Sequence, residues 1–389
     1  MPEPVAGPRT PPRARARWRR LAVAVLAPLL ALTPITAEAQ GVWLTLPSMP
    51  TARGELAGAA APCPKGQKGK CVYAIGGLND SGTVLNTVEA YSQAVNAWAT
   101  LPSMPTARSE LAGAAAPCPK GQRNSCVYAV GGADQAANPL NTAEAYSPAV
   151  NAWATLPSMP TTRSDLAGAA APCPKGLGLR GTCVYAIGGF DAAVGVNTVE
   201  AYSPAVNAWA TLPSMPTARA DLAAAAPCPK RQKETCVYAI GGVTAGLFGT
   251  VLDTVEVYDP ATNTWATLPS MPTARFFLAA ASAPCPEGQK GTCVYAIGGR
   301  DKSDNKVGTV EAYSPASNTW ATLSSLPTAR ADLAAASAPC PKGRRNTCAY
   351  AIGGRNPSNN TVGTTEAFAI ERGEPRHRGH GHGHRTEHH

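Results

Sequence analysis

Histidine is absent from the first 376 residues of this 389-residue chain, and all six histidines lie between His377 and His389. A zinc or copper site with histidine ligands, a Ser-His-Asp triad and a Cys-His pair are therefore excluded from that part. The twelve cysteines include no C-x-x-C motif, the usual signature of a thiol-disulfide oxidoreductase. The chain also lacks an amphipathic helical stretch of useful length, so strands have to build its core.

The net charge of the chain is small once its two ends are set aside. Of 34 basic and 25 acidic residues, six Arg and two Glu lie in residues 1–39, and four Arg and three Glu lie in residues 371–389. Residues 40–370 keep 24 basic and 20 acidic residues, a net charge of +4. This is far from the charge density of a nucleic-acid binder, so we expect no nucleic-acid partner.

The first 39 residues have the features of an export signal. A segment with six arginines precedes an apolar run of 12 residues, Leu21 to Leu32, and Ala37-Glu38-Ala39 forms a small-x-small cleavage site. The run is too short for a stable membrane anchor, which needs about 20 residues. We expect a secreted, periplasmic or cell-surface protein that starts near Gln40 and keeps no membrane segment. Arg19-Arg20 also fits a twin-arginine signal, so the export route, Sec or twin-arginine, stays open.

What the chain does contain is a repeat. Tryptophans recur every 55 or 56 residues, at Trp43, Trp98, Trp153, Trp209, Trp265 and Trp320. Glycine pairs recur in step with them and begin at Gly76, Gly131, Gly188, Gly241, Gly298 and Gly353. A fixed period of this length indicates an array of supersecondary units, none of which buries its apolar face alone.

Each unit contains four segments that are typical of strands. In the second unit these are an Ala-rich segment from Arg108 to Ala116, an apolar run from Cys126 to Val130, an alternating segment from Thr142 to Tyr146, and Ala152 to Leu156 around a Trp. Four strands with turn residues between them predict one propeller blade. We expect the Ala-rich strand near the axis and the Tyr and Trp side chains between blades.

The units resemble those of the kelch-repeat family. An Arg precedes the Ala-rich strand, an apolar run leads into Gly-Gly, and a Tyr and a Trp follow seven residues apart, as in Tyr91/Trp98, Tyr146/Trp153, Tyr202/Trp209, Tyr258/Trp265 and Tyr313/Trp320. The resemblance implies an all-β, six-bladed kelch-type β-propeller over residues 40–370, with four antiparallel strands per blade. The last unit has Phe368 in place of Tyr and no Trp. We therefore expect the N-terminal strand Val42–Leu46 to complete the last blade beside Thr364–Ile370 and close the ring, which removes open sheet edges.

The cysteines occur as one pair per unit. Each pair brackets the loop between the first and second strands, and in an exported chain this pattern predicts disulfides rather than zinc ligands, which need closer, converging pairs. The expected bonds are Cys63–Cys71, Cys118–Cys126, Cys173–Cys183, Cys228–Cys236, Cys285–Cys293 and Cys340–Cys348. These hairpin loops are also rich in Lys and Arg. That charge is consistent with solubility or with an acidic contact surface, and we favour solubility.

A ligand is expected on the opposite rim, where the Pro-Thr-Ala-Arg turns meet the loops after Gly-Gly. Those loops vary while the frame barely changes, which is how a rigid scaffold carries a specific surface. The resemblance implies that arginines at this position hold acidic groups of a ligand: Arg53, Arg108, Arg163, Arg219, Arg275 and Arg330. The fifth unit adds Phe276 and Phe277, and the neighbouring loop adds Leu247 and Phe248, which together form the best single contact site.

Internal pairing is the alternative for these arginines. Every unit carries a Glu on its third strand: Glu89, Glu144, Glu200, Glu256, Glu311 and Glu366. Five units add an acid two residues after the Arg: Glu55, Glu110, Asp165, Asp221 and Asp332. Eleven carboxylates against six arginines form a network that leaves nothing for a ligand, because buried charges normally pair.

The function we expect is that of a monomeric binding or scaffold module for a protein or polysaccharide, with no cofactor, no metal site and no catalytic residue. The alternative is a carbohydrate-active propeller enzyme, such as a sugar epimerase or an oxidase. Copper-radical oxidases of this architecture need histidines inside the propeller, and this chain has none there. Carboxylates are present, but they repeat with the blades, whereas a catalytic pair usually breaks the symmetry. The His-rich tail, residues 371–389, is expected to be disordered, with weak metal chelation as its alternative.

Overall fold

The computed structural model describes residues 41–119, 124–192, 194–226, 237–244, 249–286, 289, 291–341 and 346–370. The predicted signal segment 1–39, the tail 371–389, the pair Cys228/Cys236 and the loop residues Leu247 and Phe248 lie outside these ranges.

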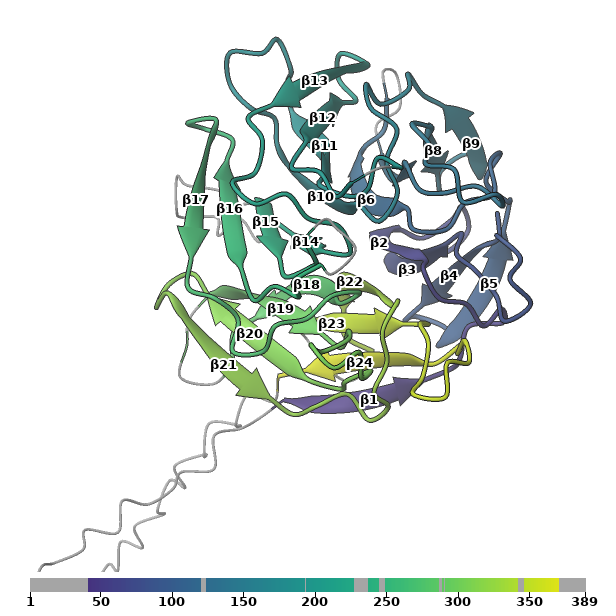
Figure 1. Ribbon diagram of the computed structural model, residues 1–389. Coiled ribbons are helices and arrows are strands. Elements are labelled where there is room, and N and C mark those ends of the chain that lie inside the picture. The colour runs from purple at the N-terminus through teal and green to yellow at the C-terminus, as the bar shows by residue number, and fades with distance from the viewer. Residues whose placement is uncertain are drawn as a thin grey trace, which may run out of the picture. The chain divides into compact units, whose positions relative to one another are not determined.

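The described residues form 24 strands in six antiparallel sheets of four strands, arranged as the blades of a propeller (Figure 1). Blades 1 to 3 consist of β2 (Ala57–Pro62), β3 (Lys70–Ile75), β4 (Val88–Ser92) and β5 (Ala97–Leu101); β6 (Ala112–Pro117), β7 (Ser125–Val130), β8 (Ala143–Ser147) and β9 (Ala152–Thr155); β10 (Ala167–Pro172), β11 (Thr182–Ile187), β12 (Val199–Ser203) and β13 (Ala208–Leu212). Blades 4 to 6 consist of β14 (Ala223–Ala225), β15 (Val237–Ile240), β16 (Val255–Asp259) and β17 (Thr264–Leu268); β18 (Ala279–Pro284), β19 (Thr292–Ile297), β20 (Val310–Ser314) and β21 (Thr319–Leu323); β22 (Ala334–Pro339), β23 (Thr347–Ile352), β24 (Thr365–Ala369) and β1 (Val42–Leu46). The predicted six-bladed fold is confirmed.

The ring closes through the two ends of the repeat array. β1 pairs antiparallel with β24, in a register that places Trp43 opposite Phe368. Figure 1 shows β1, coloured as the start of the chain, at the outer edge of a blade whose other strands come from its end. The predicted closure by the N-terminal strand is therefore confirmed, and it covers the edge that β24 would otherwise expose.

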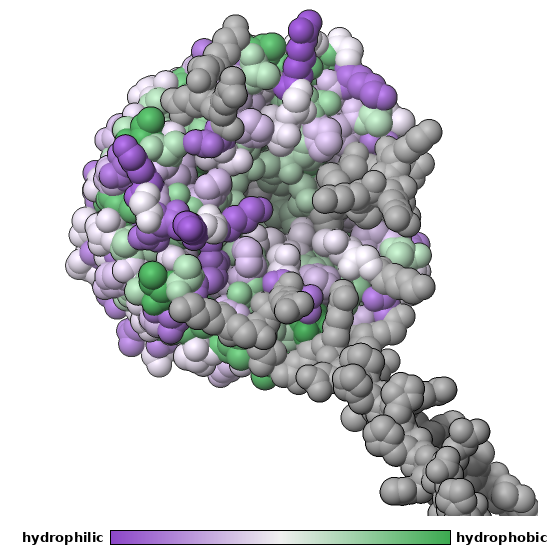
Figure 2. Space-filling view, turned by 180° about the vertical axis from the view of Figure 1, so that it is seen from behind, coloured by the Kyte–Doolittle hydropathy of each residue, from purple (hydrophilic) through white to green (hydrophobic). Residues whose placement is uncertain are grey.

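Small residues allow the inner strands to approach the axis. A methyl group added at Gly113 would lie 2.9 Å from Cβ of Ala57 and 2.9 Å from the carbonyl oxygen of Gly58, both in the preceding blade. Larger side chains have no room there, which is the physical reason for the Ala- and Gly-rich first segment of each unit. Seen from the back of the view in Figure 1, the centre of the body is hollowed and coloured toward hydrophobic (Figure 2).

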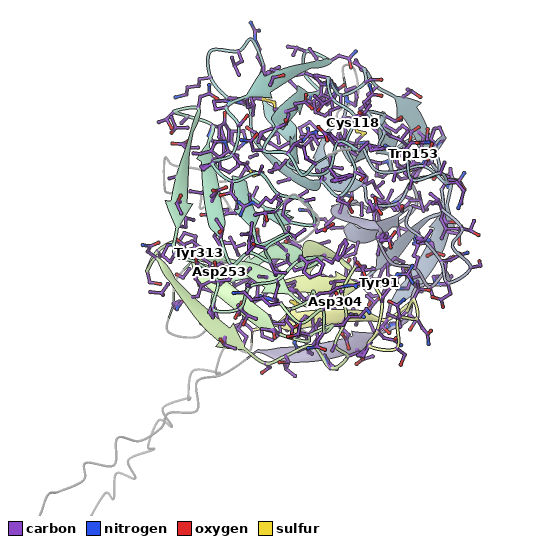
Figure 3. The ribbon with its side chains drawn as sticks, in the orientation of Figure 1. Tyr91, Cys118, Trp153, Asp253, Asp304 and Tyr313 are labelled. Atoms are coloured by element: carbon purple, nitrogen blue, oxygen red, sulfur yellow. A yellow bond between two sulfur atoms is a disulfide. The ribbon has the colours of Figure 1, made fainter. Side chains whose placement is uncertain are left out.

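Aromatic side chains join neighbouring blades. Tyr73 of blade 1 packs against Tyr146 of blade 2, with ring centroids 6.0 Å apart. Trp153, at the outer edge of blade 2, packs on Tyr146 and donates its indole N–H to the carbonyl of Pro102, 2.9 Å away, in the turn that leaves blade 1 (Figure 3). Every blade repeats this Trp hydrogen bond, including blade 6, where Trp43 donates to Ser324. The predicted inter-blade role of Tyr and Trp is confirmed.

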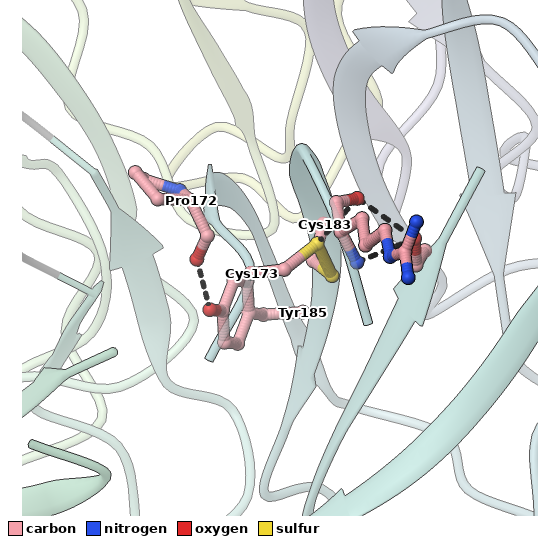
Figure 4. Close-up of a disulfide and its surroundings, with 6 residues drawn as sticks. Pro172, Cys173, Cys183 and Tyr185 are labelled. Atoms are coloured by element: carbon pink, nitrogen blue, oxygen red, sulfur yellow. Dashed lines mark hydrogen bonds between the residues drawn. A yellow bond between two sulfur atoms is a disulfide. The ribbon is translucent and has the colours of Figure 1, made fainter. Parts of the chain in front are cut away.

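Five of the six predicted disulfides are formed, and the sixth pair, Cys228/Cys236, is outside the described residues. In blade 3, Cys173 joins Cys183, and beside it the hydroxyl of Tyr185 donates to the carbonyl of Pro172 (Figure 4). Each bond closes the hairpin between the first and second strands of its blade, so it supports the sheet at the end opposite the Arg turns.

Candidate functional site

The site expected from the sequence lies on the rim where each inner strand begins. Two chain segments of every blade meet there, namely the turn that carries Arg and the loop after Gly-Gly, and we call this side the Arg-turn rim. In blade 1 the two segments are joined by a β-bridge between Gly54 and Leu78. Gly77 donates its N–H to the carbonyl of Arg108 in the next blade, 2.9 Å away. A Cβ at Gly76, where φ is +60°, would approach that same carbonyl to 2.5 Å, which explains why Gly-Gly recurs at this contact.

The six arginines of these turns are fully buried. Each pairs with the Glu on the third strand of its own blade: Arg53–Glu89 at 3.1 Å, Arg108–Glu144 at 2.7 Å, Arg163–Glu200 at 2.7 Å, Arg219–Glu256 at 2.8 Å, Arg275–Glu311 at 2.7 Å and Arg330–Glu366 at 2.7 Å. In blade 2, Arg108 also donates to the carbonyls of Gly131 and Thr142, and Thr106 donates to the second oxygen of Glu144. Burial lowers the pKa of Arg108, and the charge of Glu144 partly restores it.

This geometry agrees with internal pairing and not with direct ligand contact by the arginines. Their guanidinium groups have 0% exposure and tie the turn to the second and third strands, so a ligand on the rim cannot reach them while the pairs hold. The expectation that all eleven carboxylates belong to one network with these arginines is wrong, however. The third-strand glutamates pair with the arginines, while the acids two residues after each Arg lie elsewhere.

Those acids form a ring around the propeller axis, with Phe277 in the sixth position. Each of the six residues has φ between 50° and 57°, so its backbone turns immediately before the inner strand. The backbone N–H groups point around the ring and each donates to the carbonyl of the corresponding residue in the preceding blade. The six bonds are Glu55 to Asp332 (2.8 Å), Glu110 to Glu55 (2.9 Å), Asp165 to Glu110 (3.0 Å), Asp221 to Asp165 (3.1 Å), Phe277 to Asp221 (3.0 Å) and Asp332 to Phe277 (3.0 Å).

The side chains of this ring and the leucines that follow them line a cavity of about 90 Å³, which we call the axial pocket. Its five carboxyl groups are crowded and largely removed from water. Burial, and then the charges of Glu110 and Asp332, raise the pKa of Glu55 to about 7. Burial and the charge of Asp165 raise the pKa of Glu110 to about 7. At neutral pH the axial pocket therefore holds a mixture of protonated and ionised carboxyl groups.

Asp165 and Asp221 also interact with each other. Burial, and then the charge of Asp221, raise the pKa of Asp165 well above its usual value, and the two carboxyl groups share a side-chain hydrogen bond. Burial raises the pKa of Asp221 to about 7 even though this hydrogen bond lowers it. The two acids resist ionising together, because burial and mutual repulsion disfavour two charges in the same place.

Two arginines contact one side of the ring only. Arg300 pairs with Asp332 at 3.2 Å and lies over the ring of Phe277, 5.2 Å from its centroid. Arg355 lies 3.7 Å from Glu55. The carboxyl groups of blades 6 and 1 thus have cationic neighbours, while Glu110, Asp165 and Asp221 belong to blades 2, 3 and 4 on the other side.

A second hollow opens beside that less neutralised side. It has a volume of about 290 Å³ and is lined by Phe190, Gly195, Val243, Thr244 and Gly249 of the loops of blades 3 and 4, and by Asp165 and Asp221. We call it the blade 3–4 groove. It shares Asp165 and Asp221 with the axial pocket, so these two carboxyl groups contribute to both.

Family comparison agrees with this architecture. The model of the kelch motif matches residues 61–105, 116–160, 171–216, 233–272 and 289–327, which is more than half of the chain. The chain belongs to the kelch-repeat family. Kelch-like protein 35 of Mus musculus is 29% identical over 260 residues, covering 66% of this chain and 38% of that protein. Kelch-like protein terF of Aspergillus terreus is 26% identical over 270 residues, covering 66% of this chain and 54% of that protein. The chain thus matches about half or less of the length of these relatives.

Among solved structures, that of YjhT superposes on this kelch propeller with a TM-score of 0.59 and 15% identity. The match covers 85% of this chain and 98% of YjhT, and at this identity it supports the fold alone.

The kelch propeller places the remaining predicted contact residues as follows. Phe277 lines the axial pocket, and Phe276 packs against it with ring centroids 5.1 Å apart. Leu247 and Phe248 are outside the described residues. The axial acids are the residues whose role the sequence did not reveal. The sequence contains a pattern that marks them, since each acid precedes an inner strand by two residues. A sequence alone does not show, however, which way a side chain in a left-handed turn points.

Among the residues that the structure describes, no cluster of three or more His, Cys, Asp or Glu side chains has an arrangement suited to a metal ion. Those same residues include no helix with the length and hydrophobicity that crossing a membrane requires.

Proposed function

We propose that this kelch propeller is an extracytoplasmic binding module that holds a protein partner on its Arg-turn rim. The observation that carries the proposal is the contrast between frame and loops. The Arg–Glu pairs and Trp hydrogen bonds repeat in every blade, while the loops after Gly-Gly, at 78–86, 133–141, 190–197, 243–253, 300–308 and 355–363, differ in sequence. Variable loops on a repeated rigid frame are typical of a recognition surface.

Hydrogen bonds hold the rim loops of blades 1 and 2 in place before any partner binds. The side chain of Asn79 accepts hydrogen bonds from the backbone N–H groups of Ser81 and Thr83, and that of Asp134 accepts from Ala136 and Asn138. Adjacent loops are also joined, because Gln135 of blade 2 accepts from the N–H of Val84 in blade 1 and donates to the carbonyl of Gly82. Ordered loops lose less conformational entropy on association, which favours affinity.

The five disulfides support a location outside the cytoplasm, because such bonds persist in oxidising compartments. We therefore include cleavage of residues 1–39 in the proposal. The N-terminal sequence of the protein recovered from its native host tests this step directly, with a start at or near Gln40 as the expected result and a retained residue 1 as the contrary one.

Site-specific photo-cross-linking tests the binding surface. A photoreactive amino acid is placed on the Arg-turn rim at Ala136 or Lys302, and on the opposite rim at Gln67 as the matched control; all three positions are exposed. We expect a protein adduct from the first two positions only. The partner is then identified by mass spectrometry and its binding is measured with both proteins purified.

Exchange of one loop provides the decisive variant. Residues 133–141 are replaced by the sequence of 78–86, which has the same length and the same place in its blade, so the frame is preserved. We expect at least a ten-fold loss of affinity for the purified partner, as for the removal of a central contact. Unchanged affinity, adducts only from Gln67, or binding of glycans without any protein partner would refute the proposal.

A further inference from the structure

The axial pocket combines a ring of carboxyl groups with cationic neighbours on one side only. Arg300 and Arg355 form ion pairs with Asp332 and Glu55, on the side of blades 6 and 1. The blade 3–4 groove lies on the opposite side, where Asp165 and Asp221 line both hollows. The two hollows therefore share two carboxyl groups on the side away from these arginines.

We propose that the axial pocket receives a cationic side chain, an arginine or a lysine, which a protein partner inserts through the blade 3–4 groove. The inference rests on the proposed function for the origin of that side chain, but the pocket's preference for a cation stands on its own geometry.

The first observation that supports the proposal is the lack of a hydrogen-bond donor, in the described part of the chain, at one oxygen of Asp221. Its Oδ1 atom is buried, and among the described residues no N–H, hydroxyl or cationic group donates a hydrogen bond to it. Its neighbour is another acid, Asp165, so the adjacent side chain supplies no positive charge. A buried carboxyl oxygen without a regular donor is costly, and a guanidinium or ammonium group supplies several donors together with the missing charge.

The sizes of the two hollows are the second support. The axial pocket, at about 90 Å³, is much smaller than the roughly 300–1,000 Å³ of pockets that enclose drug-sized ligands. It suits the end of a side chain and not a whole ligand. The blade 3–4 groove is larger, at about 290 Å³, and includes the apolar side chains of Phe190 and Val243, which fit the methylene groups of a long basic side chain.

The proposal predicts that the affinity of the axial pocket for a cation depends on pH. The carboxyl groups that face the site are Glu110, Asp165 and Asp221, with Glu55 and Asp332 across the axial pocket and Arg300 and Arg355 beyond those two. A bound cation favours the ionised carboxyl groups, so it displaces protons from the ring. Affinity for a cation consequently rises with pH through the range in which these groups titrate, near pH 7.

The test uses the mature protein and two small probes, Nα-acetyl-arginine amide and the uncharged isostere Nα-acetyl-citrulline amide, with binding measured by NMR titration. We expect the arginine probe to bind at least ten-fold more tightly than the citrulline probe at pH 8. Its affinity should fall about thirty-fold between pH 8 and pH 5.5, as one group with a pKa near 7 predicts when only its ionised form binds the cation. Direct measurement with a probe keeps this result separate from the partner experiment on the rim.

Two variants locate the binding. Asp221→Asn, which preserves shape, should weaken the arginine probe at least ten-fold, because it removes the charge at the junction of the two hollows. Asp134→Asn is the matched control: it removes one negative charge from the same rim, but the side chain of Asp134 hydrogen-bonds to Ala136 and Asn138 in its own loop and lines neither hollow. Its affinity should stay within two-fold of the wild type.

Each contrary result has a definite meaning. Equal binding of both probes, equal effects of the two variants, or no binding of the arginine probe at millimolar concentration would overturn the inference. If the probes fail while a purified partner still depends on loop 133–141, the proposed function stands without the cationic side chain. If the probes behave as expected while cross-links form only at Gln67, the axial pocket binds cations but the partner does not use the Arg-turn rim.

Discussion

Trp43 packs against Phe368 with ring centroids 5.1 Å apart, and this contact joins the first strand of the propeller to the last. The indole N–H of Trp43 also donates to Ser324 of blade 5, so one residue links two blades and closes the ring. In the other blades the Trp lies on a strand that follows its neighbour directly in the chain. In blade 6 the two strands come from opposite ends of the folded body.

Removal of β1 should therefore open the ring. We expect a chain that begins at Pro47 to lose several kcal/mol of stability, on the scale of about 3–5 kcal/mol for deletion of a packed Trp alone, and to self-associate through the exposed edge of β24. Urea denaturation and light scattering measure the two effects, with a chain that begins at Gly41 as the control. Addition of a peptide of residues 41–50 should restore the monomer. A stable monomer that starts at Pro47 would show that closure does not depend on this strand.

The Arg–Glu pairs should behave as one buried unit. We expect Arg108→Met or Glu144→Leu alone to destabilise the fold by about 3–5 kcal/mol, because each leaves an uncompensated buried charge. The double variant should cost clearly less than the sum of the two, since apolar replacement of a whole buried pair is often tolerated. A double-mutant cycle by denaturant titration checks this, and additive effects would contradict a coupled pair.

The axial acids should make stability fall as pH rises. The pKa values of Glu55, Glu110 and Asp221 are raised to about 7 in the folded protein, so the native state holds more protons than the unfolded chain between about pH 4 and pH 7. The contribution of these acids is fully present at low pH and is lost as pH rises through about 7. Chemical denaturation between pH 5 and pH 8 measures the trend.

The variant Asp221→Asn tests the origin of that trend. Its stabilising effect should be about 2–3 kcal/mol larger at pH 8 than at pH 5, because it removes the ionisation of a buried acid. Asp134→Asn, in a rim loop outside the axial pocket, should leave the slope unaltered. A slope that Asp221→Asn does not reduce would place the titrating groups outside the axial pocket.

The disulfides should stabilise each hairpin separately. Replacement of Cys173 and Cys183 by Ser should cost about 2–3 kcal/mol, as loop-closure entropy predicts for a sequence separation of 10 residues. The corresponding pair in blade 2, Cys118/Cys126, closes a loop of similar length and should cost the same within a few tenths of a kcal/mol. Thermal and denaturant unfolding of the two double variants compares them, and a large inequality would indicate strain or coupling to a neighbouring blade.

Much of the fold could be predicted because its signals are local and repeated six times. Alternation in Thr142–Tyr146, the bulky apolar residues around Cys126–Val130 and the turn residues between them mark strands directly. The missing Trp after Phe368 and the unmatched Trp43 at the other end predicted closure, because a blade without its fourth strand leaves an open edge.

The site was less predictable, for a physical reason. Arg108, Glu110 and Glu144 are all charged, and the sequence indicated only that some of them would pair. In the structure these side chains point to different places. Arg108 is buried against Glu144, while the left-handed turn at Glu110 directs that side chain toward the axis. The clustering of five acids is a property of the closed ring, since the members of the cluster lie about 55 residues apart in sequence.

The sequence by itself determined the repeat, the strands, the cysteine pairs and the need for a closing strand, because each depends on neighbouring residues or on a missing partner. Only the tertiary structure decided which carboxyl groups neutralise the arginines and which face one another across the axis. The reason is that closure of the ring brings six equivalent turns together around the axis. Burial and mutual repulsion, which are absent from any single unit, then raise the pKa values of the acids there.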